Sequence, residues 1–315
     1  WYHTEVPIWY SEDGLKIVVP PHGTYVQPWR ETPPPGSEVL DRVTRESIGF
    51  YDTMAGDLGE LVGEEKVFDT WMDSSNSNLY VSGYISDPEL FKRAFPTSIR
   101  PQGKEIVRTW LYYTLLKSAL LLDKPGFANI WIDGLGMDPW GRKMSKSLGN
   151  GIDPLEVVNA YGADAMRFTI ISQAAVGTDI NLDHEDVEAT FSNGRNFSNK
   201  IWNAGRFALL SLGDAPVRPL NEVVSDLALE DRWILARLGH ATRTATRNLE
   251  RYRLHEVADG LYHFFWGELC DWYLELVKDR LTLDTDAKSR EAARSTLVAV
   301  LDEALRLLHP IVPFV

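Results

Sequence analysis

Ten residues, 141–150, constrain the fold of this chain more than any other stretch. They read Gly-Arg-Lys-Met-Ser-Lys-Ser-Leu-Gly-Asn and hold two lysines three residues apart, two serine hydroxyls and a glycine near each end. A strand-like apolar run precedes them at residues 130–132, and Asp153-Pro154 marks the start of a helix after them. Strand, loop and helix in this order are typical of the closing half of a doubly wound α/β domain, where ligands bind at the carboxyl end of a strand.

The chemistry of this loop is that of a polyphosphate-binding loop. Two ammonium groups and several backbone N–H donors on a mobile loop can close onto phosphate oxygens. The alternative interpretation is a flexible basic turn on the surface, since loops rich in lysine and serine are often no more than that. The position between a strand and a helix favours the phosphate loop.

Composition sets broad limits. The 315 residues are enough for two domains with separate cores, and 44% hydrophobic with 24% charged residues is typical of a globular protein. No apolar run approaches the ~20 residues that span a bilayer, so we expect no membrane partner. The single cysteine, Cys270, excludes an internal disulfide and favours a reducing, cytoplasmic location. A net charge of −13 is not the footprint of a nucleic-acid-binding surface, although a local basic stripe can still serve one.

The pattern along the chain predicts an α/β part followed by an all-α part. Residues 1–66 are loop-rich, with short apolar runs and dense prolines, as in a β-rich insertion, and residues 67–185 carry the strand, the loop and its helices. From 186 to 315 apolar residues recur at helical steps. We expect helices at 183–212, 229–251, 254–278 and 287–308, joined in an antiparallel bundle.

Lys-Met-Ser-Lys-Ser between a strand and a helix resembles the lysine-loop signature of the class I aminoacyl-tRNA synthetases, subclass Ia. Residues 6–10 are similar to the segment by which valyl, isoleucyl and leucyl members return from an editing insertion to the catalytic domain. Asp69-Thr70-Trp71, the stretch 106–110 and Arg195-Asn196-Phe197 resemble the valyl members most. The resemblance implies the C-terminal half of a Rossmann-like nucleotide-binding domain followed by an incomplete anticodon-binding domain.

The function that this resemblance implies is the ATP-dependent joining of valine to tRNA through an aminoacyl-adenylate, with Mg²⁺ accompanying ATP. The implied catalytic residues are Lys143 and Lys146, with Ser145 and Ser147 as auxiliary donors. The residues implied to bind ATP are Gly103, Glu105, Asp133, Gly134 and Met144. Relatives often have Asp where this chain has Glu105, which makes a contact to the ATP ribose longer by one methylene.

Three apolar side chains are the implied walls of an amino-acid pocket. Trp71 is expected at the end of a strand, and Ile106 and Trp110 are expected one turn apart on a helix that runs from 106 to 122. Two indoles would leave room for one small branched side chain such as that of valine. The alternative is that all three side chains belong to an ordinary core.

Arg243, Arg247 and Arg251 fall four residues apart on one face of a predicted helix. On a bundle that binds tRNA they would form a track for the phosphate backbone. The alternative is a solvated helix face balanced by neighbouring carboxylates, which is the more common role of such a stripe.

Other expectations concern metals, completeness and identity. Many relatives carry a zinc-binding Cys pair where this chain reads Ser-Glu-Asp-Gly at 11–14, so we expect no zinc and no other resident metal. Both ends look cut, and without the first half of the nucleotide fold we expect the isolated chain to be inactive; the full-length enzyme is expected to be a monomer. The alternatives are an isoleucyl or leucyl ligase of the same subclass, or a non-catalytic tRNA-binding paralogue.

Overall fold

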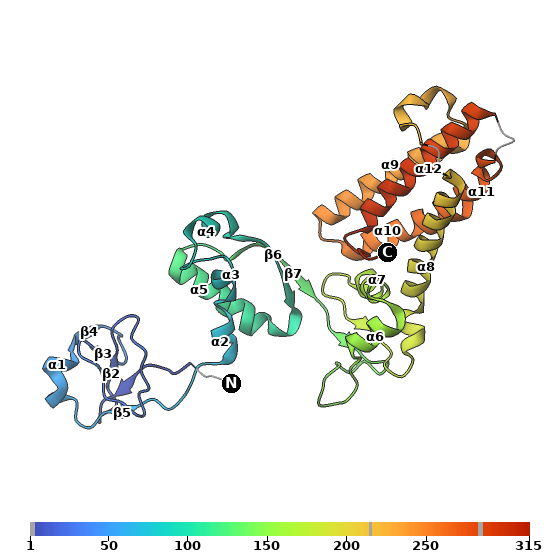
Figure 1. Cartoon of the computed structure of the whole chain (residues 1–315). Helices are drawn as coiled ribbons and strands as arrows, with labels where there is room; N and C mark the ends of the chain where they lie inside the picture. Colours follow the sequence, from blue (N-terminus) through green and yellow to red (C-terminus); the bar gives the residue numbers. More distant parts are fainter. Residues whose placement is uncertain (1–3, 214–215, 283–285) are drawn as a thin grey trace. The chain divides into compact units, whose positions relative to one another are not determined.

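The computed structural model describes residues 4–213, 216–282 and 286–315, which form two compact units (Figure 1). Unit 1 comprises Trp1–Arg100 and Glu105–Ile130, and unit 2 comprises Pro101–Lys104 and Trp131–Val315. Within the described residues, no helix is both long enough and apolar enough to cross a membrane. The expected domain boundaries near residues 66 and 185 remain predictions.

Unit 1 opens with a small antiparallel sheet in the order β4-β3-β2-β1-β5. The strands are β1 Trp9–Tyr10, β2 Lys16–Val19, β3 Glu38–Asp41, β4 Ser47–Phe50 and β5 Val62–Gly63. The short helix α1, Tyr51–Met54, and a 3-10 turn at Ala55–Asp57 follow β4. Trp9 pairs with Val18 on β2, and both are buried in the same small core, with the Trp9 indole donating to the Glu31 carbonyl at 2.8 Å.

The rest of unit 1 is mostly helical and departs from expectation at three places. Its helices are α2 Thr70–Ser74, α3 Ser77–Val81, α4 Pro88–Ala94 and α5 Tyr112–Leu122. Trp71 was expected at a strand end, but it lies in α2, because the Asp69 carboxylate caps that helix by accepting from the Trp71 N–H at 2.7 Å. The helix expected from 106 begins as a 3-10 turn, Lys104–Ile106, and a π-helical turn, Val107–Leu111, before α5.

Strand β6, Thr97–Gly103, is the third departure. It runs through the polar residues 100–103, including Pro101, which carry no apolar pattern that would predict a strand. The strand pairs with β7, Phe127–Asp133, which confirms the strand predicted before the lysine loop.

Unit 2 holds the lysine loop between a strand pair and two helices. Strands β8, Gly136–Met137, and β9, Ile180–Asn181, pair in parallel. Helix α6, Pro154–Tyr161, begins and ends as predicted, since the Asp153 side chain accepts from the Leu155 N–H and Gly162 follows the last turn. Helix α7, Ala163–Gln173, comes next.

The helical bundle of unit 2 follows α7 (Figure 1). Its helices are α8 Val187–Leu212, α9 Leu229–Glu250, α10 Leu254–Tyr262, α11 Leu274–Val277 and α12 Ala287–Leu308, with short 3-10 turns at Leu220–Glu222, Val224–Asp226 and Asp279–Leu281. The predicted single helix 254–278 is instead α10, a π-helical segment at His263–Tyr273, and α11. These observations confirm an α/β part followed by a helical part.

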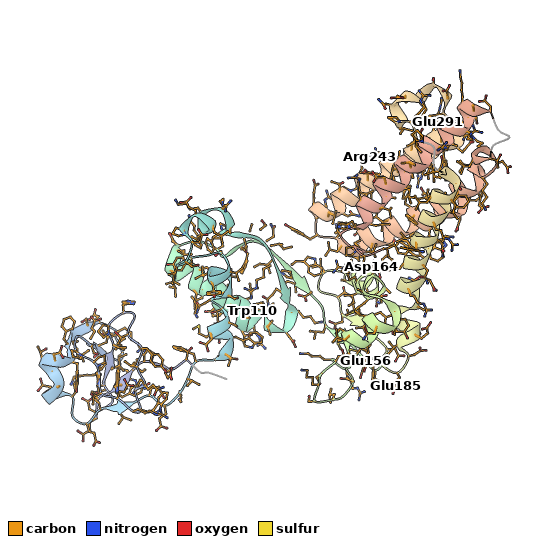
Figure 2. The ribbon with its side chains drawn as sticks, in the orientation of Figure 1. Trp110, Glu156, Asp164, Glu185, Arg243 and Glu291 are labelled. Atoms are coloured by element: carbon orange, nitrogen blue, oxygen red, sulfur yellow. The ribbon has the colours of Figure 1, made fainter. Side chains whose placement is uncertain are left out.

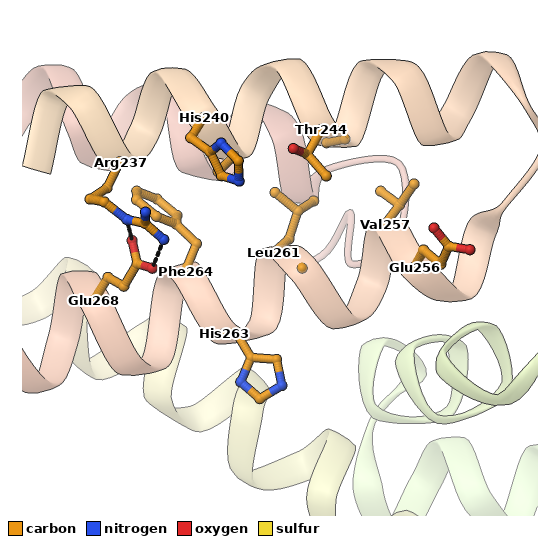
Figure 3. Close-up of a pocket in the computed structure, with 12 residues that line it drawn as sticks. Arg237, His240, Thr244, Glu256, Val257, Leu261, His263, Phe264 and Glu268 are labelled. Carbon is orange, nitrogen blue, oxygen red and sulfur yellow. Dashed lines mark hydrogen bonds and ion pairs between the residues drawn. The ribbon is translucent and has the colours of Figure 1, made fainter.

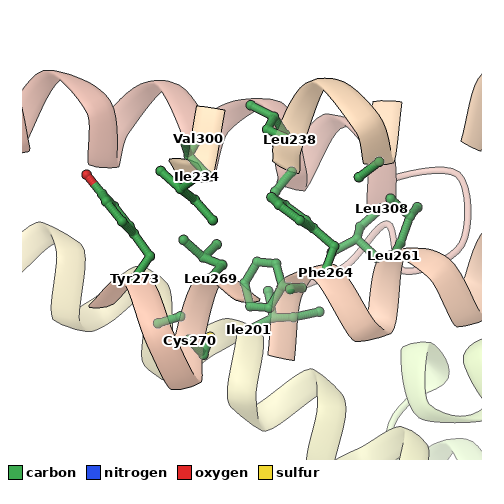
Figure 4. Close-up of a cluster of buried hydrophobic side chains, with 14 of the residues drawn as sticks. Ile201, Ile234, Leu238, Leu261, Phe264, Leu269, Cys270, Tyr273, Val300 and Leu308 are labelled. Carbon is green, nitrogen blue, oxygen red and sulfur yellow. The ribbon is translucent and has the colours of Figure 1, made fainter. Parts of the chain in front are cut away.

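The bundle core is continuous across helices α8, α9, α10, α11 and α12 and the π-helical segment. Figure 4 shows Ile201, Ile234, Leu269 and Val300 meeting in it from α8, α9, the π-helical segment and α12. The only cysteine of the sequence, Cys270, is buried in the same core, and burial raises the pKa of its thiol to about 12.

Hydrogen bonds of Trp131, Arg167 and Asp164 tie the α/β part of unit 2 to the bundle. The Trp131 indole on β7 donates to the Tyr252 carbonyl, in the turn between α9 and α10, at 3.0 Å. Arg167 on α7 donates to the carbonyls of Pro310 and Ile311, and Asp164 accepts from the Phe314 N–H. The segment that carries the lysine loop is therefore packed on the bundle.

Candidate active site

The lysine loop is anchored at its base by backbone pairing. The Met144 N–H donates to the Gly136 carbonyl at 2.9 Å, and Met137 and Lys143 form an isolated antiparallel bridge. Because Gly136 and Met137 also pair with β9, the loop leaves the edge of a strand pair and returns to it. The structure thus places Lys143 and Met144 at the exit of a strand.

The tip of the loop presents polar groups outward. Lys143, Lys146 and Ser147 are exposed, and the Ser145 and Ser147 hydroxyls lie 3.2 Å apart. An open hollow of about 650 Å³ lies beside the tip, lined by Met144, Ser145, Lys146, Gly149, Gly151, Ile152, Asp153 and Pro154. Ammonium groups and hydroxyls around an open hollow can accept a polyphosphate.

Two buried residues that sequence reasoning missed lie beneath this loop. Asp138 is fully buried and accepts hydrogen bonds from the N–H groups of Trp140 and Arg142, from the Arg142 Nε and from the Asn150 Nδ2. Burial alone would raise the pKa of the Asp138 carboxyl, but the hydrogen bonds from Asn150 and Arg142 and the Arg142 charge outweigh it and lower the pKa to about 2. The available signal in the sequence was a polar residue at each end of a loop flanked by glycines, namely Asp138 and Asn150.

The depressed pKa predicts how the loop responds to acid. The folded-state pKa of about 2 lies below the ordinary value of 3.8, so this carboxylate stabilises the fold fully above pH ~4. That contribution is lost as the pH falls from ~4 through 2. We expect amide exchange in residues 142–149, corrected for its intrinsic pH dependence, to accelerate over this range and to be constant from pH 5 to 8. Loosening that begins at pH 5 to 6 would contradict the assignment.

The predicted ATP-binding residues Gly103, Asp133 and Gly134 lie in unit 2. A further residue, Asp179, connects the two stretches of chain that carry them. Its Oδ1 lies 2.6 Å from the Lys104 Nζ, next to Gly103, and accepts from the Leu135 N–H, next to Gly134. The Lys104 hydrogen bond is the main reason that the pKa of Asp179 lies below its usual range. Gly134 has no room for a side chain, since a Cβ there would lie 1.9 Å from the Thr178 carbonyl oxygen.

The predicted pocket residues lie in unit 1, as does Glu105. The rings of Trp71 and Trp110 are 6.1 Å apart with an interplanar angle of 38°. Trp71 is exposed, Ile106 and Trp110 are half-buried, and the Trp110 indole donates to the Ser74 carbonyl at 3.1 Å. The structure therefore brings the two indoles together, and the wall assigned to Ile106 remains a prediction.

A buried guanidinium supports Trp110 from behind. The Arg100 Cζ lies 3.5 Å from the centroid of the Trp110 ring, and its Nη1 donates to the Thr114 hydroxyl at 3.1 Å. Burial lowers the pKa of Arg100 to about 10. A cation over the indole stabilises the ring in this orientation.

The three predicted tRNA-binding arginines lie in line on α9 and its C-terminus. Arg243, labelled in Figure 2, and Arg247 are exposed on α9, and Arg251 is the exposed residue that caps it. Among residues 4–213, 216–282 and 286–315, no carboxylate lies within ion-pair distance of any of the three. The tRNA-binding role of the stripe therefore remains a prediction, beside the alternative of a solvated helix face.

The bundle also has a small cavity of about 160 Å³ between α9 and the α10 side (Figure 3). Arg237 and Glu268 form a bidentate ion pair at one end of it, and His240 and Thr244 line its α9 side. None of the predicted site residues lines this cavity.

Comparison with known proteins supports the synthetase resemblance along the whole chain. Residues 1–183 match the family of tRNA synthetases class I (I, L, M and V), and residues 231–315 match the anticodon-binding domain of tRNA ligase. Valine–tRNA ligases of Petrotoga mobilis and Thermotoga maritima are 40% and 41% identical over 315 and 314 residues. In both cases the match covers 100% of this chain and 32% of the relative, so the chain spans about a third of their length.

Solved structures agree on the fold. The LeuRS of Agrobacterium radiobacter K84, in a ternary complex with tRNA and LeuAMS, superposes with a TM-score of 0.63 at 21% identity, covering 99% of this chain and 38% of that one. The methionyl-tRNA synthetase of Mycobacterium tuberculosis with methionyl-adenylate gives 0.61 at 17% identity, covering 99% and 69%. With more than half of its length matching the family, the chain belongs to the class I tRNA synthetases.

Proposed function

We propose that this chain serves the ATP-dependent ligation of valine to tRNA through a valyl-adenylate. The observation that carries the proposal is the lysine loop beside an open hollow, in a chain whose whole length is 34–41% identical to valine–tRNA ligases. In the first step the valine carboxylate attacks the α-phosphorus of ATP and pyrophosphate leaves. In the second step a tRNA ribose hydroxyl takes the valyl group and AMP leaves.

Electrostatic stabilisation is the role that we assign to the loop. Negative charge builds on the phosphate oxygens as pyrophosphate departs, and Lys143 and Lys146 would stabilise that charge, with Ser145 and Ser147 donating hydrogen bonds. No protein nucleophile is needed, because positioning of the two substrates supplies the remaining rate. Mg²⁺ would arrive with the ATP phosphates, which is its usual mode of binding; the described residues contain no group of three or more side chains able to hold a metal alone.

Valine selectivity is assigned to the pair of indoles in unit 1. Their ring centroids lie 6.1 Å apart, so the two indoles together would form one apolar wall of the valine site. An apolar pocket discriminates one methylene by only ~1–3 kcal/mol, a general limit for which these synthetases are the standard example. We therefore expect Trp110→Ala to relax discrimination against isoleucine and leucine, read as the ratio of kcat/KM values. A Trp110→Phe variant separates this effect from instability, since it retains an aromatic ring. If selectivity is unchanged while the melting temperature falls, Trp110 belongs to the core only.

The arginine stripe is assigned to the tRNA backbone. Each phosphate contact contributes ~0.7–0.9 to the slope of log affinity against log salt, so replacing Arg243, Arg247 and Arg251 by Gln should lower the slope by ~2–3 and weaken tRNA binding. The matched control is Arg306→Gln, an exposed arginine that already pairs with Asp302. A slope equal to that of the control would return the stripe to a solvated helix face.

The function is tested by amino-acid-dependent exchange of pyrophosphate into ATP. We expect no exchange by the chain alone, and exchange by a chimera that carries residues 1–315 in place of the matched segment of the Thermotoga maritima ligase. Valine should be preferred over isoleucine and leucine. A preference for isoleucine or leucine would assign the chain to another ligase of the subclass. A folded chimera that binds tRNA but exchanges with no amino acid would indicate a non-catalytic paralogue. We further propose that the full-length protein is a monomer and that it is cytoplasmic; the single, buried cysteine supports the cytoplasmic location.

A further inference from the structure

Two buried side chains, Asp138 and Asn150, stand at the two ends of the lysine loop and contact each other. Asp138 is 0% exposed and Asn150 is 2% exposed, and the Asn150 Nδ2 donates to the Asp138 Oδ2 at 3.0 Å. The residues assigned to the phosphates all lie in the 11-residue stretch between them. Being buried, neither side chain is available to touch a ligand in the hollow.

Asn150 holds the backbone on both sides of Met144. Its Oδ1 accepts from the Ser145 N–H at 2.9 Å, and its Nδ2 donates to the Lys143 carbonyl at 3.3 Å. One side chain thus fixes the peptide groups next to the first lysine and the first serine of the loop.

Asp138 holds the preceding turn. Its Oδ1 accepts from the Trp140 N–H at 3.1 Å and from the Arg142 N–H at 2.8 Å, and its Oδ2 pairs with the Arg142 Nε at 2.7 Å. The Arg142 guanidinium also lies 5.0 Å from the Trp140 ring centroid. Arg142 therefore already has a buried counter-ion.

The loop needs such a restraint because of its glycines. Gly141 and Gly149 adopt left-handed φ values of 74° and 64°, a region where glycine is freer than any other residue. Ordering a flexible backbone costs conformational entropy, a cost that would otherwise fall on ligand binding. A buried tether orders the loop when the protein folds, so the lysines are already ordered before the phosphates bind and the entropy cost does not weaken binding.

We propose that Asp138 and Asn150 are positioning residues, a buried tether that holds the lysine loop in the conformation that receives the ATP phosphates, with Arg142 as the counter-ion of Asp138 and not a phosphate ligand. This inference rests on the phosphate role proposed for the loop. Its effect on catalysis is indirect and acts through Lys143, Ser145 and Lys146.

The test uses the 315-residue chain and two measurements, amide hydrogen exchange across residues 142–149 and affinity for magnesium-ATP as a function of salt. Asn150→Ala removes the contacts to Asp138, Lys143 and Ser145 without adding charge. It should speed exchange at Ser145 and weaken ATP binding, each by about tenfold or more, as for the loss of three hydrogen bonds. The reversed pair Asp138→Asn/Asn150→Asp keeps the net charge and can rebuild the central contact, so it should recover part of both losses. Asn221→Ala, at an exposed asparagine elsewhere in unit 2, should change neither.

Two further variants separate this inference from the proposed function. Lys146→Ala should weaken ATP binding and lower its salt dependence without loosening the loop, whereas Arg142→Gln should loosen the loop and leave the salt dependence unchanged. The tether is overturned if Asn150→Ala leaves exchange unchanged, or if it loosens the loop while ATP affinity stays at the wild-type value. The phosphate role itself fails if Lys146→Ala leaves ATP affinity and its salt dependence intact.

Discussion

Lys146→Ala, placed in the active chimera, is expected to lower the rate of valine-dependent pyrophosphate exchange by ~10²–10³-fold, as when one preorganised donor to a developing charge is lost. Lys146 is exposed at the loop tip and lines the hollow that we assign to the phosphates. The KM for valine should change little, because the lost contact is to ATP. Steady-state kinetics with each substrate varied in turn would measure both effects.

The matched control for Lys146 is Lys92→Ala, at an exposed lysine on α4 that pairs with Glu89. It removes the same charge from unit 1 and should leave the exchange rate within about twofold, since an exposed ion pair contributes ~1 kcal/mol or less. If Lys146→Ala weakened valine binding and left the exchange rate intact, the assignment of Lys146 to the phosphates would be wrong.

Asp231→Ala is expected to lower the free energy of unfolding of the bundle by ~3–5 kcal/mol, the range for removing one partner of a buried ion pair. Asp231 is fully buried and pairs with the Arg280 Nη2 at 2.8 Å. It also accepts from the Tyr273 hydroxyl at 2.9 Å and from the Ala228 N–H at 3.0 Å. Burial raises the pKa of Tyr273, and the adjacent Asp231 charge adds to that shift. The Tyr273 hydroxyl therefore remains a neutral donor.

The control for this stability effect is Asp302→Ala, which removes an ion pair of similar geometry from the surface of α12. Both Asp302 and Arg306 are mostly exposed, so the expected loss is ~0–1 kcal/mol. Urea unfolding followed by circular dichroism measures both variants. Equal losses for Asp231→Ala and Asp302→Ala would mean that the buried network contributes no more than a surface pair.

The parts of the fold that the sequence predicts well are those with local signals at both ends. Helix α6 has Asp153 and Pro154 at its start and Gly162 after its end, and α12 keeps its apolar period from Ala287 to Leu308. Such elements are specified by capping and by periodicity, both of which are legible without tertiary contacts.

The sequence-based predictions are wrong where a distant contact or a single side chain determines the backbone conformation. Among the described residues, Val67 makes an isolated bridge with Glu5 before the Asp69 carboxylate starts a helix, so the apparent strand ends short of Trp71. The interior of the predicted helix 254–278 is π-helical, a departure that the periodicity of apolar residues did not reveal. In the candidate site, the exposed lysines follow from the motif, whereas Asp138 and Asn150 matter only because both are buried against each other.

The central claim is that the lysine loop receives the phosphates of ATP, and one titration tests it most directly. Backbone amide signals of the 315-residue chain, labelled with ¹⁵N, would be followed as magnesium-ATP, inorganic triphosphate or adenosine is added. We predict that ATP and triphosphate shift the signals of residues 143–149 in a saturable manner and that adenosine leaves them in place. Shifts by triphosphate that cluster on the arginine stripe of α9, with residues 143–149 unaffected, would contradict the account.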